Sequence, residues 1–306
     1  MVSIPSYTGT EASQYEAKRA HKDVWQAEQV LITEMVDKGP LLDVPIGTGR
    51  YLPTYEAKGI WPWGLDVSED MIAEARKKRP NLDYKVGSIL EIPWPDQHFA
   101  LCVCTRLLNW LSPDDMKAAV RELLRVAPES VVSIRLGKPE QQKATITHGW
   151  GDFLNALRGA WIAEQRQVKD ETPNGIYWMM RVRMPTMQDV LDQFQWNKNS
   201  LQTLADEWCD RYGLPRVEMK DLPVRCEYLT GKEIGRCVDA MAELEPRLLA
   251  SGSPSVSNPP RVDGGPITWL EFNAGYGQVD GRHRVHRWRE TDKRYPVLIV
   301  DCRGEL

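Results

Sequence analysis

The sequence contains no hydrophobic run long enough to cross a membrane. A spanning helix needs roughly 20 consecutive apolar residues, whereas the clearly apolar runs are as short as Phe99–Cys104 and Val297–Val300. The first residues, Met1–Ala12, are polar and lack the basic start and apolar centre of a signal peptide. We therefore expect a soluble, cytoplasmic protein without a membrane partner.

Cysteine and histidine are too scattered to indicate a metal site. The chain has 6 cysteines and 5 histidines, with no C-x-x-C pair and no closely spaced histidine beside a cysteine. Zinc sites usually show such spacings, so we expect no bound metal. Reduced thiols are the ordinary state in a cytoplasm. The cysteines are Cys102, Cys104, Cys209, Cys226, Cys237 and Cys302.

Neither sign of charge is in strong excess. Lys and Arg number 39 and Asp and Glu number 43, which gives a net charge of −4. This balance argues against a protein that binds duplex DNA over its whole surface, and it is compatible with a local basic patch. The 306 residues, of which 42% are hydrophobic and 27% charged, are typical of two globular domains or one large one.

Phenylalanine is scarce, with 4 residues, whereas tryptophan is abundant, with 12. Several tryptophans have polar neighbours in the sequence, where a flat ring could line a pocket. Packing in the core is the alternative and the more common use of this residue. The tryptophans in question are Trp61, Trp63, Trp94 and Trp110.

The first half of the chain alternates short apolar segments with amphipathic ones. Helices are predicted over residues 11–37, over Met71–Lys78 with Ser68 as N-cap, and from Pro113 with Ser112 as N-cap. Such alternation predicts an α/β fold, a Rossmann-like doubly wound and mostly parallel sheet with helices on both faces. The predicted strands are Leu41–Val44, Ile60–Leu65, Asp83–Val86, Phe99–Cys104 and Val131–Leu136.

The second half has a looser pattern and ends in a segment of its own character. A Ser- and Pro-rich stretch, Ser251–Arg261, reads as a loop or linker. We expect two domains, residues 1–221 and a smaller α+β domain over 222–306. The predicted helices are Thr186–Trp196, Ser200–Tyr212, Gly231–Leu249 and Arg282–Glu290, and the predicted strands are Ile176–Met184, Ile267–Leu270, Tyr276–Val279 and Tyr295–Val300.

A glycine-containing loop follows the first predicted strand, in the pattern Asp43-x-Pro45-x-Gly47-x-Gly49. Glycine lets the backbone turn sharply and lets a ligand approach closely. The loop is not the dinucleotide pattern G-x-G-x-x-G, because Arg50–Pro53 supplies no third glycine. It is therefore a modest signal by itself.

The signal is strengthened by Asp66, seventeen positions after Gly49, at the end of the second predicted strand. An acid at this place can accept both hydroxyl groups of a ribose, because ligands of open α/β sheets bind at the carboxyl ends of the strands. A structural turn with a helix-capping aspartate is the alternative.

These residues resemble the class I S-adenosylmethionine-dependent methyltransferases. The likeness is carried by residues from about 10 to 140, and it implies a methyltransferase domain that uses S-adenosyl-L-methionine as cofactor. The family usually has glycine where Pro45 stands, and proline occurs there in a familiar variant of the motif. The matching segments are Leu41–Arg50, Gly64–Ile72, Gly87–Phe99 and Arg121–Val126.

The resemblance implies specific cofactor contacts. Asp43 and the loop of Pro45, Gly47 and Gly49 would face the methionine part, and Asp66 would hold the ribose hydroxyls.

The remaining implied contacts surround the adenine and close the site. Arg106 would follow the fourth strand and face the cofactor or the substrate. Tyr15 and Arg19, one helical turn apart, resemble a pair that in many members closes on the cofactor carboxylate, and a surface charge is the alternative for Arg19. The adenine would lie beside Val67, Met71, Ser88 and Ile89, with Ser88 at a position where the family more often has Asp or Asn.

The methyl acceptor is not encoded in an obvious motif. Thr105–Trp110 is not the N/D-P-P-aromatic motif of amino-directed DNA methyltransferases, and no Pro-Cys nucleophile stands there. Ser257–Arg261 resembles that motif superficially but lacks the aromatic residue. A general base is needed only where the nucleophile must lose a proton, so no catalytic residue is predicted. Asn109, Trp110, Trp150 and Tyr177 could line an acceptor pocket or pack in the core.

A second signal is a basic segment near the C-terminus. Between Gly281 and Arg294 there are six Arg or Lys and two acids, about +4 within an acidic protein. A strand, a glycine turn and a helix start that carries Arg and His form an anion site in many proteins. A solvated basic face is the alternative.

This segment resembles the ParB/sulfiredoxin-type nucleotide-binding fold. In that fold a G-x-x-R-like turn between a strand and a helix holds a nucleoside triphosphate, so the resemblance implies nucleotide or phosphate binding here. Tyr295–Val300 would be the short strand that follows. No cysteine precedes the turn, which speaks against sulfiredoxin chemistry. The matching turn residues are Gly281, Arg282, His283 and Arg284.

Two hypotheses of different class follow. One is an S-adenosylmethionine-dependent methyltransferase whose acceptor is a nucleotide, a nucleic acid or a small molecule, with a C-terminal nucleotide-binding module. The other is a nucleotide-gated, ParB-like DNA-binding or regulatory protein that senses the cofactor without transferring its methyl group. Methyl transfer to an added acceptor distinguishes the two.

Overall fold

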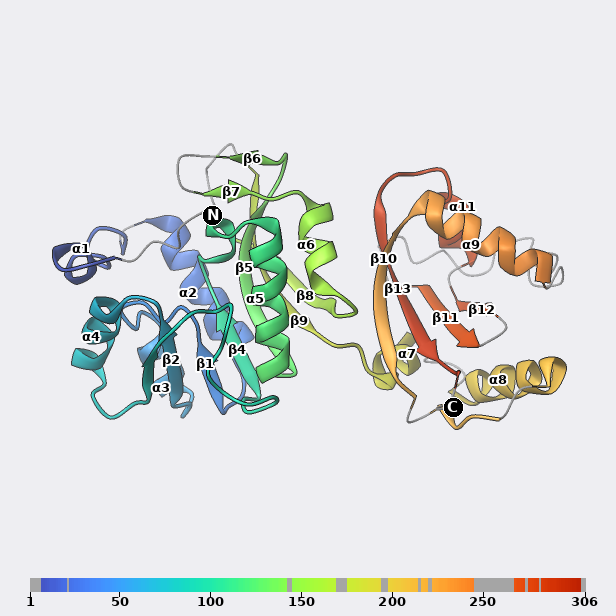
Figure 1. The fold of residues 1–306 in the computed structure, drawn as a ribbon, viewed down its shortest axis with the longest axis horizontal. Coiled ribbons are helices and arrows are strands. Elements are labelled where there is room, and N and C mark those ends of the chain that lie inside the picture. Colours follow the sequence, from blue (N-terminus) through green and yellow to red (C-terminus); the bar gives the residue numbers. More distant parts are fainter. Residues whose placement is uncertain are drawn as a thin grey trace. The chain divides into compact units, whose positions relative to one another are not determined.

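The chain folds into two compact units in the computed structural model (Figure 1). The first unit comprises residues 1–158 and 162–183, and the second comprises 159–161 and 184–306. This division falls before the domain boundary expected at 221/222. The structure describes residues 7–20, 22–141, 145–168, 175–193, 198–213, 216–219, 222–244, 267–272, 275–280 and 282–303.

The first unit is built on a seven-stranded mixed sheet of order β3-β2-β1-β4-β5-β9-β8. Strands β1 to β5 are parallel, and β9 pairs antiparallel with β5. The five strands expected in the first half are all present, within two residues of the expected ends. The bounds are β1 Leu41–Asp43, β2 Pro62–Asp66, β3 Tyr84–Val86, β4 Leu101–Cys104, β5 Glu129–Leu136, β8 Trp161–Gln167 and β9 Ile176–Arg183.

Helices cover both faces of this sheet. One face packs Leu41, Leu101 and Val103 against α2 (Asp23–Met35), α3 (Leu52–Ala57) and α4 (Glu69–Lys78) in a single buried cluster. On the other face, α5 (Pro113–Val126) lies beside α6 (Trp150–Leu157) (Figure 1). The alternation of side chains along each strand explains why neighbouring residues serve opposite faces.

The predicted N-caps of two helices are confirmed. The side chain of Ser68 accepts a hydrogen bond from Met71 N at 3.2 Å, and that of Ser112 accepts one from Asp115 N at 3.1 Å. Each serine thereby satisfies an amide at the start of a helix that has no partner within it.

The single helix expected over 11–37 is wrong. The structure has α1, Thr10–Ser13, then turns, and then α2, Asp23–Met35. Ala12 is the one buried residue of α1. The helix does not continue, because residues 14–20 lack an apolar stripe that could hold it against the sheet. The sequence pattern also did not indicate the connecting elements η1 (Leu108–Trp110), β6 (Glu140–Gln141) and β7 (Ile146–Thr147).

The second unit is a four-stranded sheet of order β10-β13-β11-β12 with helices on both faces. Side chains alternate along β13: Leu298 and Val300 pack in a cluster with α7 and α8, and Val297 and Ile299 in one with α9 and α11. Helices α7 and α8 therefore belong to this unit. The bounds are α7 Met187–Gln193, α8 Lys198–Tyr212, β10 Val224–Thr230, α9 Gly231–Leu244, β11 Ile267–Phe272, β12 Gly275–Asp280, α11 Arg282–Trp288 and β13 Arg294–Asp301.

The strand and helix expected around the basic segment are both present, as β12 and α11. Gly281, the side chains of Arg282, His283 and Arg284, and the expected linker Ser251–Arg261 lie outside the described residues. None of the described helices is long and apolar enough to cross a membrane.

Candidate functional site

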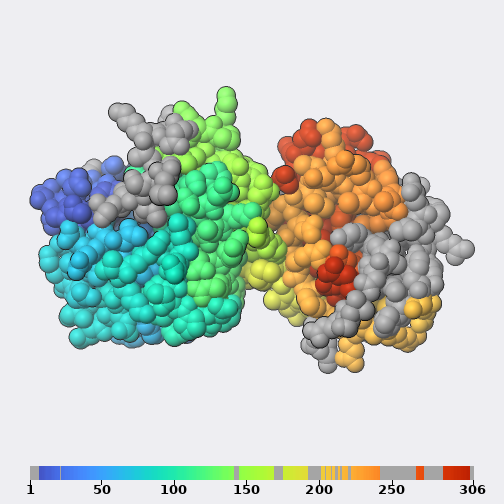
Figure 2. All heavy atoms as spheres, in the orientation of Figure 1, coloured from blue at the N-terminus to red at the C-terminus, as the bar shows by residue number. Residues whose placement is uncertain are grey.

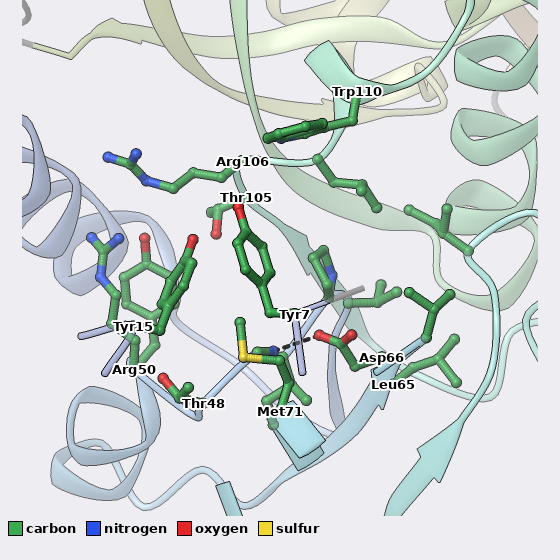
Figure 3. A pocket seen from close by; sticks show the side chains of 18 of the residues that line it. Tyr7, Tyr15, Thr48, Arg50, Leu65, Asp66, Met71, Thr105, Arg106 and Trp110 are labelled. Carbon is green, nitrogen blue, oxygen red and sulfur yellow. Dashed lines mark hydrogen bonds between the residues drawn. The ribbon is translucent and has the colours of Figure 1, made fainter. Parts of the chain in front are cut away.

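A cleft opens in the first unit at the carboxyl ends of β1, β2 and β4 (Figure 3). The strand order reverses between β1 and β4, and ligands of open α/β sheets bind at such a switch point. Its empty space, including the part open to solvent, is about 850 Å³. The lining residues are Tyr7, Tyr15, Trp25, Val44, Pro45, Ile46, Gly47, Thr48, Arg50, Tyr51, Leu65, Asp66, Val67, Met71, Gly87, Ile89, Thr105, Arg106, Leu107 and Trp110.

Glycine is required at the two loop positions for different structural reasons. Both have positive φ, +55° at Gly47 and +71° at Gly49, a conformation that residues with a Cβ rarely adopt. A Cβ at Gly49 would lie 2.4 Å from Leu52 Cδ1, so this glycine lets α3 pack closely. A Cβ at Gly47 would meet no atom within 4 Å. Gly47 therefore leaves open space at a lining residue of the cleft, whereas Gly49, which is not among the lining residues, serves packing.

Asp66 links the glycine loop to the start of α4. Its Oδ2 accepts a hydrogen bond from Gly47 N at 2.9 Å, and its Oδ1 accepts one from Ser68 N at 2.9 Å. Burial raises the pKa of Asp66, and these backbone N–H groups partly offset the rise. The carboxylate lines the cleft, where each oxygen retains a lone pair for a ligand hydroxyl.

Asp43 is buried next to the lining residue Val44 and is not itself among the lining residues. Its side chain is 1% exposed, and Tyr55 Oη donates a hydrogen bond to Oδ2 at 3.1 Å. Oδ1 has no hydrogen-bond partner in the described part of the chain. Burial raises the pKa of Asp43 to about 8.

Three of the four residues expected around adenine line the cleft: Val67, Met71 and Ile89. Ser88 does not, and its hydroxyl accepts a hydrogen bond from Leu90 N at 3.1 Å. Pro45 lines the cleft as well.

The N-terminal segment lies over the glycine loop and α4. Tyr15 lines the cleft, whereas Arg19 is not a lining residue and stacks on the Tyr15 ring, with its Cζ 3.9 Å from the ring centroid. Gly9 N donates to Asp70 Oδ2 at 2.8 Å, which fixes the segment to α4. The space-filling view shows the N-terminal residues, in dark blue, against the light-blue surface that includes α4 (Figure 2).

A buried ion cluster forms the end of the cleft away from Asp66. Arg106 follows β4 with a positive φ of 59°, and its Nε donates to Glu28 Oε2 at 2.7 Å. Arg50 Nη1 donates to the same oxygen at 2.9 Å. Arg106 was expected in the cleft, whereas Glu28 and Arg50 were not, because α2 meets the loop only in the folded chain. The one sequence signal was the arginine directly after Gly49.

The residues weighed for an acceptor pocket have different surroundings. Trp110 lines the cleft. Asn109 Nδ2 donates hydrogen bonds to Arg135 O of β5 and to Ile146 O of β7, and the buried Tyr177 hydroxyl lies 2.6 Å from Ser133 Oγ. Trp150, 38% exposed, meets the Trp178 ring edge-on and is not a lining residue.

Comparison with known proteins places the methyltransferase pattern on this part of the chain. Residues 41–129 match the family model described as "Methyltransferase domain". The chain is 30% identical over 136 residues to malonyl-[acyl-carrier protein] O-methyltransferase of Yersinia pestis, covering 44% of this chain and 46% of that protein. It is 31% identical over 124 residues to an uncharacterized methyltransferase-like protein of Schizosaccharomyces pombe, covering 38% and 45%. The chain thus spans less than half the length of these relatives.

Among solved structures, magnesium protoporphyrin IX methyltransferase from Synechocystis, with bound S-adenosylmethionine, aligns with a TM-score of 0.48 at 16% identity. The alignment covers 58% of this chain and 93% of that one. Within the first unit, the segment that resembles a methyltransferase domain runs from β1 to the start of β5, and it includes the strands at whose carboxyl ends the cleft lies.

The residues present in the cleft fit an S-adenosyl group. Asp66 offers carboxylate oxygens at one end, and Arg50 and Arg106 offer guanidinium groups at the other (Figure 3). There is open space at Gly47, whose N–H binds Asp66, and Oδ1 of the buried Asp43 has no hydrogen-bond partner among the described residues. An elongated ligand with ribose hydroxyls and an amino-acid end matches this distribution of charge.

Proposed function

We propose that the chain is an S-adenosylmethionine-dependent methyltransferase whose acceptor is a nucleotide, a nucleic acid or a small molecule. The single observation that carries this proposal is the cleft at the switch point, where the Gly47 loop and the Asp66 carboxylate meet. The match of residues 41–129 to the methyltransferase domain family supports the proposal independently.

The cleft residues have distinct parts in this function. Asp66 holds the ribose hydroxyls, and Val67, Met71 and Ile89 surround the adenine. Arg106 and Trp110 stand where the chain leaves β4, so they border the space for the acceptor. When bound, the cofactor supplies an electrophilic methyl group, and the protein's task is to align the acceptor and exclude water.

The curated relative that methylates malonyl-[acyl-carrier protein] is named for an O-methyl transfer to a small acyl group on a carrier. Among the three classes, this name favours a small acyl group over a nucleotide or a nucleic acid as the acceptor. Nucleotides and nucleic acids stay within the proposal because of the basic segment in the second unit.

We also propose that the second unit binds a nucleotide or phosphate group through Gly281, Arg282, His283 and Arg284. The support is that β12 ends at Asp280 and α11 begins at Arg282, so the three basic residues form the first turn of this helix. Helix N-termini and guanidinium groups both favour phosphate. The likeness of this segment to the ParB/sulfiredoxin-type fold rests on the sequence.

The test is transfer of label from methyl-tritiated cofactor to panels of nucleotides, DNA, RNA and small acids, amines and alcohols, with and without nucleoside triphosphate. The proposal expects label in at least one acceptor class and none with Asp66→Ala at equal cofactor concentration. Micromolar binding of the cofactor without label in any class would instead favour the cofactor-sensing regulatory protein.

A further inference from the structure

One wall of the cleft is the segment that joins β4 to α5, residues 105–111. Four of its residues line the cleft: Thr105, Arg106, Leu107 and Trp110. Figure 3 shows the ring of Trp110 across the cleft from Met71. Trp110 belongs to η1, a single 3-10 turn closed by a hydrogen bond from Trp110 N to Leu107 O at 2.7 Å. A turn this short is weakly stable alone, so contacts with its surroundings must fix the ring.

The side chain of Asn109 binds the neighbouring strand as the backbone of another strand would. Its Oδ1 accepts a hydrogen bond from Arg135 N at 2.8 Å, and its Nδ2 donates to Arg135 O at 3.0 Å. Nδ2 also donates to Ile146 O of β7 at 2.7 Å. Both amide protons and one lone pair of the oxygen are therefore engaged, which fixes the orientation of the amide. An aspartate could not replace it, because a carboxylate would face two carbonyl oxygens.

His148 holds the same turn at the preceding residue. Its side chain is buried, with 1% exposed, and its Nε2 lies 3.1 Å from Leu108 O. Because a carbonyl oxygen can only accept, Nε2 carries the proton and donates it. Nδ1 is buried and has no hydrogen-bond partner among the described residues. His148 O accepts a hydrogen bond from Gly137 N at 2.9 Å, so the histidine is itself anchored at the end of β5.

Neither Asn109 nor His148 lines the cleft. Their hydrogen bonds fix the two residues that directly precede Trp110 in the chain. Leu108 is also fully buried, which adds an apolar anchor to the two polar ones. A side chain that is held in this way is preorganised for a ligand, because little conformational freedom is lost when the ligand binds.

We propose that Trp110 contacts the methyl acceptor and that Asn109 and His148 are positioning residues, which hold its ring at the acceptor side of the cleft; this rests on the proposed methyltransferase function. In that function Asp66 and Met71 bind the adenosyl part of the cofactor, and Trp110 lies across the cleft from Met71 (Figure 3). A tryptophan ring offers a large apolar face to a ligand. Displacement of this ring would weaken binding of the acceptor and disturb its alignment with the methyl group.

The test is a double-mutant cycle on methyl transfer by the full chain, with the acceptor that takes label in the transfer assay. Trp110→Ala should raise the KM for this acceptor at least about tenfold. Asn109→Ala should raise it several-fold, because the ring is then no longer held. The double variant should be no worse than Trp110→Ala alone, since Asn109 acts through the ring. Calorimetry should show an affinity for S-adenosylhomocysteine within about threefold of the unmodified chain in all three variants.

Two substitutions of His148 separate its donor from its volume. His148→Gln keeps an N–H donor for Leu108 O and should leave the acceptor KM nearly unchanged. His148→Phe keeps a ring but loses the donor, and it should resemble Asn109→Ala. Should Asn109→Ala not fold, His148→Phe takes its place in the cycle. Asn81→Ala is the matched control, because Asn81 is exposed between α4 and β3, and it should change neither KM nor affinity.

Fluorine NMR of the chain labelled with 5-fluorotryptophan observes the ring directly. The resonance of Trp110 is assigned by its absence in Trp110→Phe. It should shift or broaden in Asn109→Ala and in His148→Phe, and it should keep its position in His148→Gln and Asn81→Ala. A general loss of stability would instead affect the tryptophan resonances of the whole chain.

Failure of this inference differs from failure of the proposed function. The absence of both S-adenosylhomocysteine binding and label transfer would remove the methyltransferase proposal itself. With transfer intact, an unchanged acceptor KM in Trp110→Ala would overturn the inference. Effects of Asn109→Ala and Trp110→Ala that multiply in the double variant would show that Asn109 acts independently of the ring, which would also overturn it. A loss of S-adenosylhomocysteine affinity in Asn109→Ala would assign the turn to the cofactor instead of the acceptor.

Discussion

Individual carboxylates in the first unit differ in function because their surroundings differ. Asp66 is held by two backbone N–H groups and lines the cleft, whereas Asp43 is buried and one of its oxygens has no hydrogen-bond partner among the residues that the structure describes. Glu28 is buried between two guanidinium groups. These three acids therefore have separate surroundings: Asp66 faces the cleft, Asp43 is buried with a raised pKa, and Glu28 positions two arginines.

The change Asp66→Ala should weaken cofactor binding at least about tenfold, equal to roughly 1.4 kcal/mol, because the acceptor for the ribose hydroxyls is lost. Isothermal titration calorimetry with S-adenosylhomocysteine measures the effect. Asp114→Ala, at an exposed position in the first turn of α5, is the matched control and should bind as the unmodified chain does. An unchanged affinity in Asp66→Ala would refute the ribose assignment.

Asp43 should make stability depend on pH. Burial raises the pKa of Asp43 to about 8. Between about pH 4 and pH 8, the folded chain therefore keeps a proton that the unfolded chain has already released. The free energy of unfolding therefore falls as pH rises through this window, by at most about 1.4 kcal/mol per pH unit. Asp43→Asn should lose this slope and gain stability relative to the unmodified chain as pH rises.

Urea unfolding at about pH 5 and pH 8 tests this sign. The exposed control Asp114→Asn should keep the slope of the unmodified chain. A constant difference in stability between Asp43→Asn and the unmodified chain across the window would show that Asp43 is ionised in the folded protein.

In the glycine loop between β1 and α3, one glycine allows close packing and the other leaves space for a ligand. Gly47→Ala should cost about 1–2 kcal/mol of stability for the positive φ and should weaken cofactor binding, because its Cβ enters the open space. Gly49→Ala adds a clash with Leu52, so it should cost about 2–5 kcal/mol.

Thermal unfolding and calorimetry with S-adenosylhomocysteine distinguish the two variants. The folded fraction of Gly49→Ala should bind almost normally, since this residue does not line the cleft. If Gly49→Ala were the more stable of the two, or Gly47→Ala bound the cofactor product normally, the division of roles would be wrong.

The central elements of the first unit could be predicted from the sequence because their patterns are local. Apolar strands such as Leu41–Asp43, and the caps Ser68 and Ser112, depend on neighbours a few residues away. Strands β8 and β10 were missed. β8 is only partly buried, so it has no strict apolar alternation, and β10 mixes buried and half-buried residues along its length.

The cleft was predictable where the sequence motif itself supplies the residues, as with Gly47 and Asp66. Its other wall was not, because Tyr7, Trp25 and Glu28 come from segments that meet the loop only in the folded chain. The break in the helix expected over 11–37 has the same cause: residues 7–20 contact the loop and α4 instead of the sheet.

For the whole molecule, the two units carry separate cores, which favours separate ligands. Arg284→Ala should weaken binding of nucleoside triphosphate several-fold and leave S-adenosylhomocysteine binding unchanged, because removal of one guanidinium affects only the anion site. Calorimetric titrations with each ligand measure both affinities. Asp66→Ala should give the opposite pattern. A joint loss of both affinities in Arg284→Ala would contradict independent sites.

The most direct measurement is a crystal structure of the full chain with S-adenosylhomocysteine. It should show the ribose on the Asp66 carboxylate, the backbone of Gly47 against the ligand, and the adenine among Val67, Met71 and Ile89. Density for the ligand at any other place, or a cleft filled by the protein's own side chains under saturating ligand, would contradict the account.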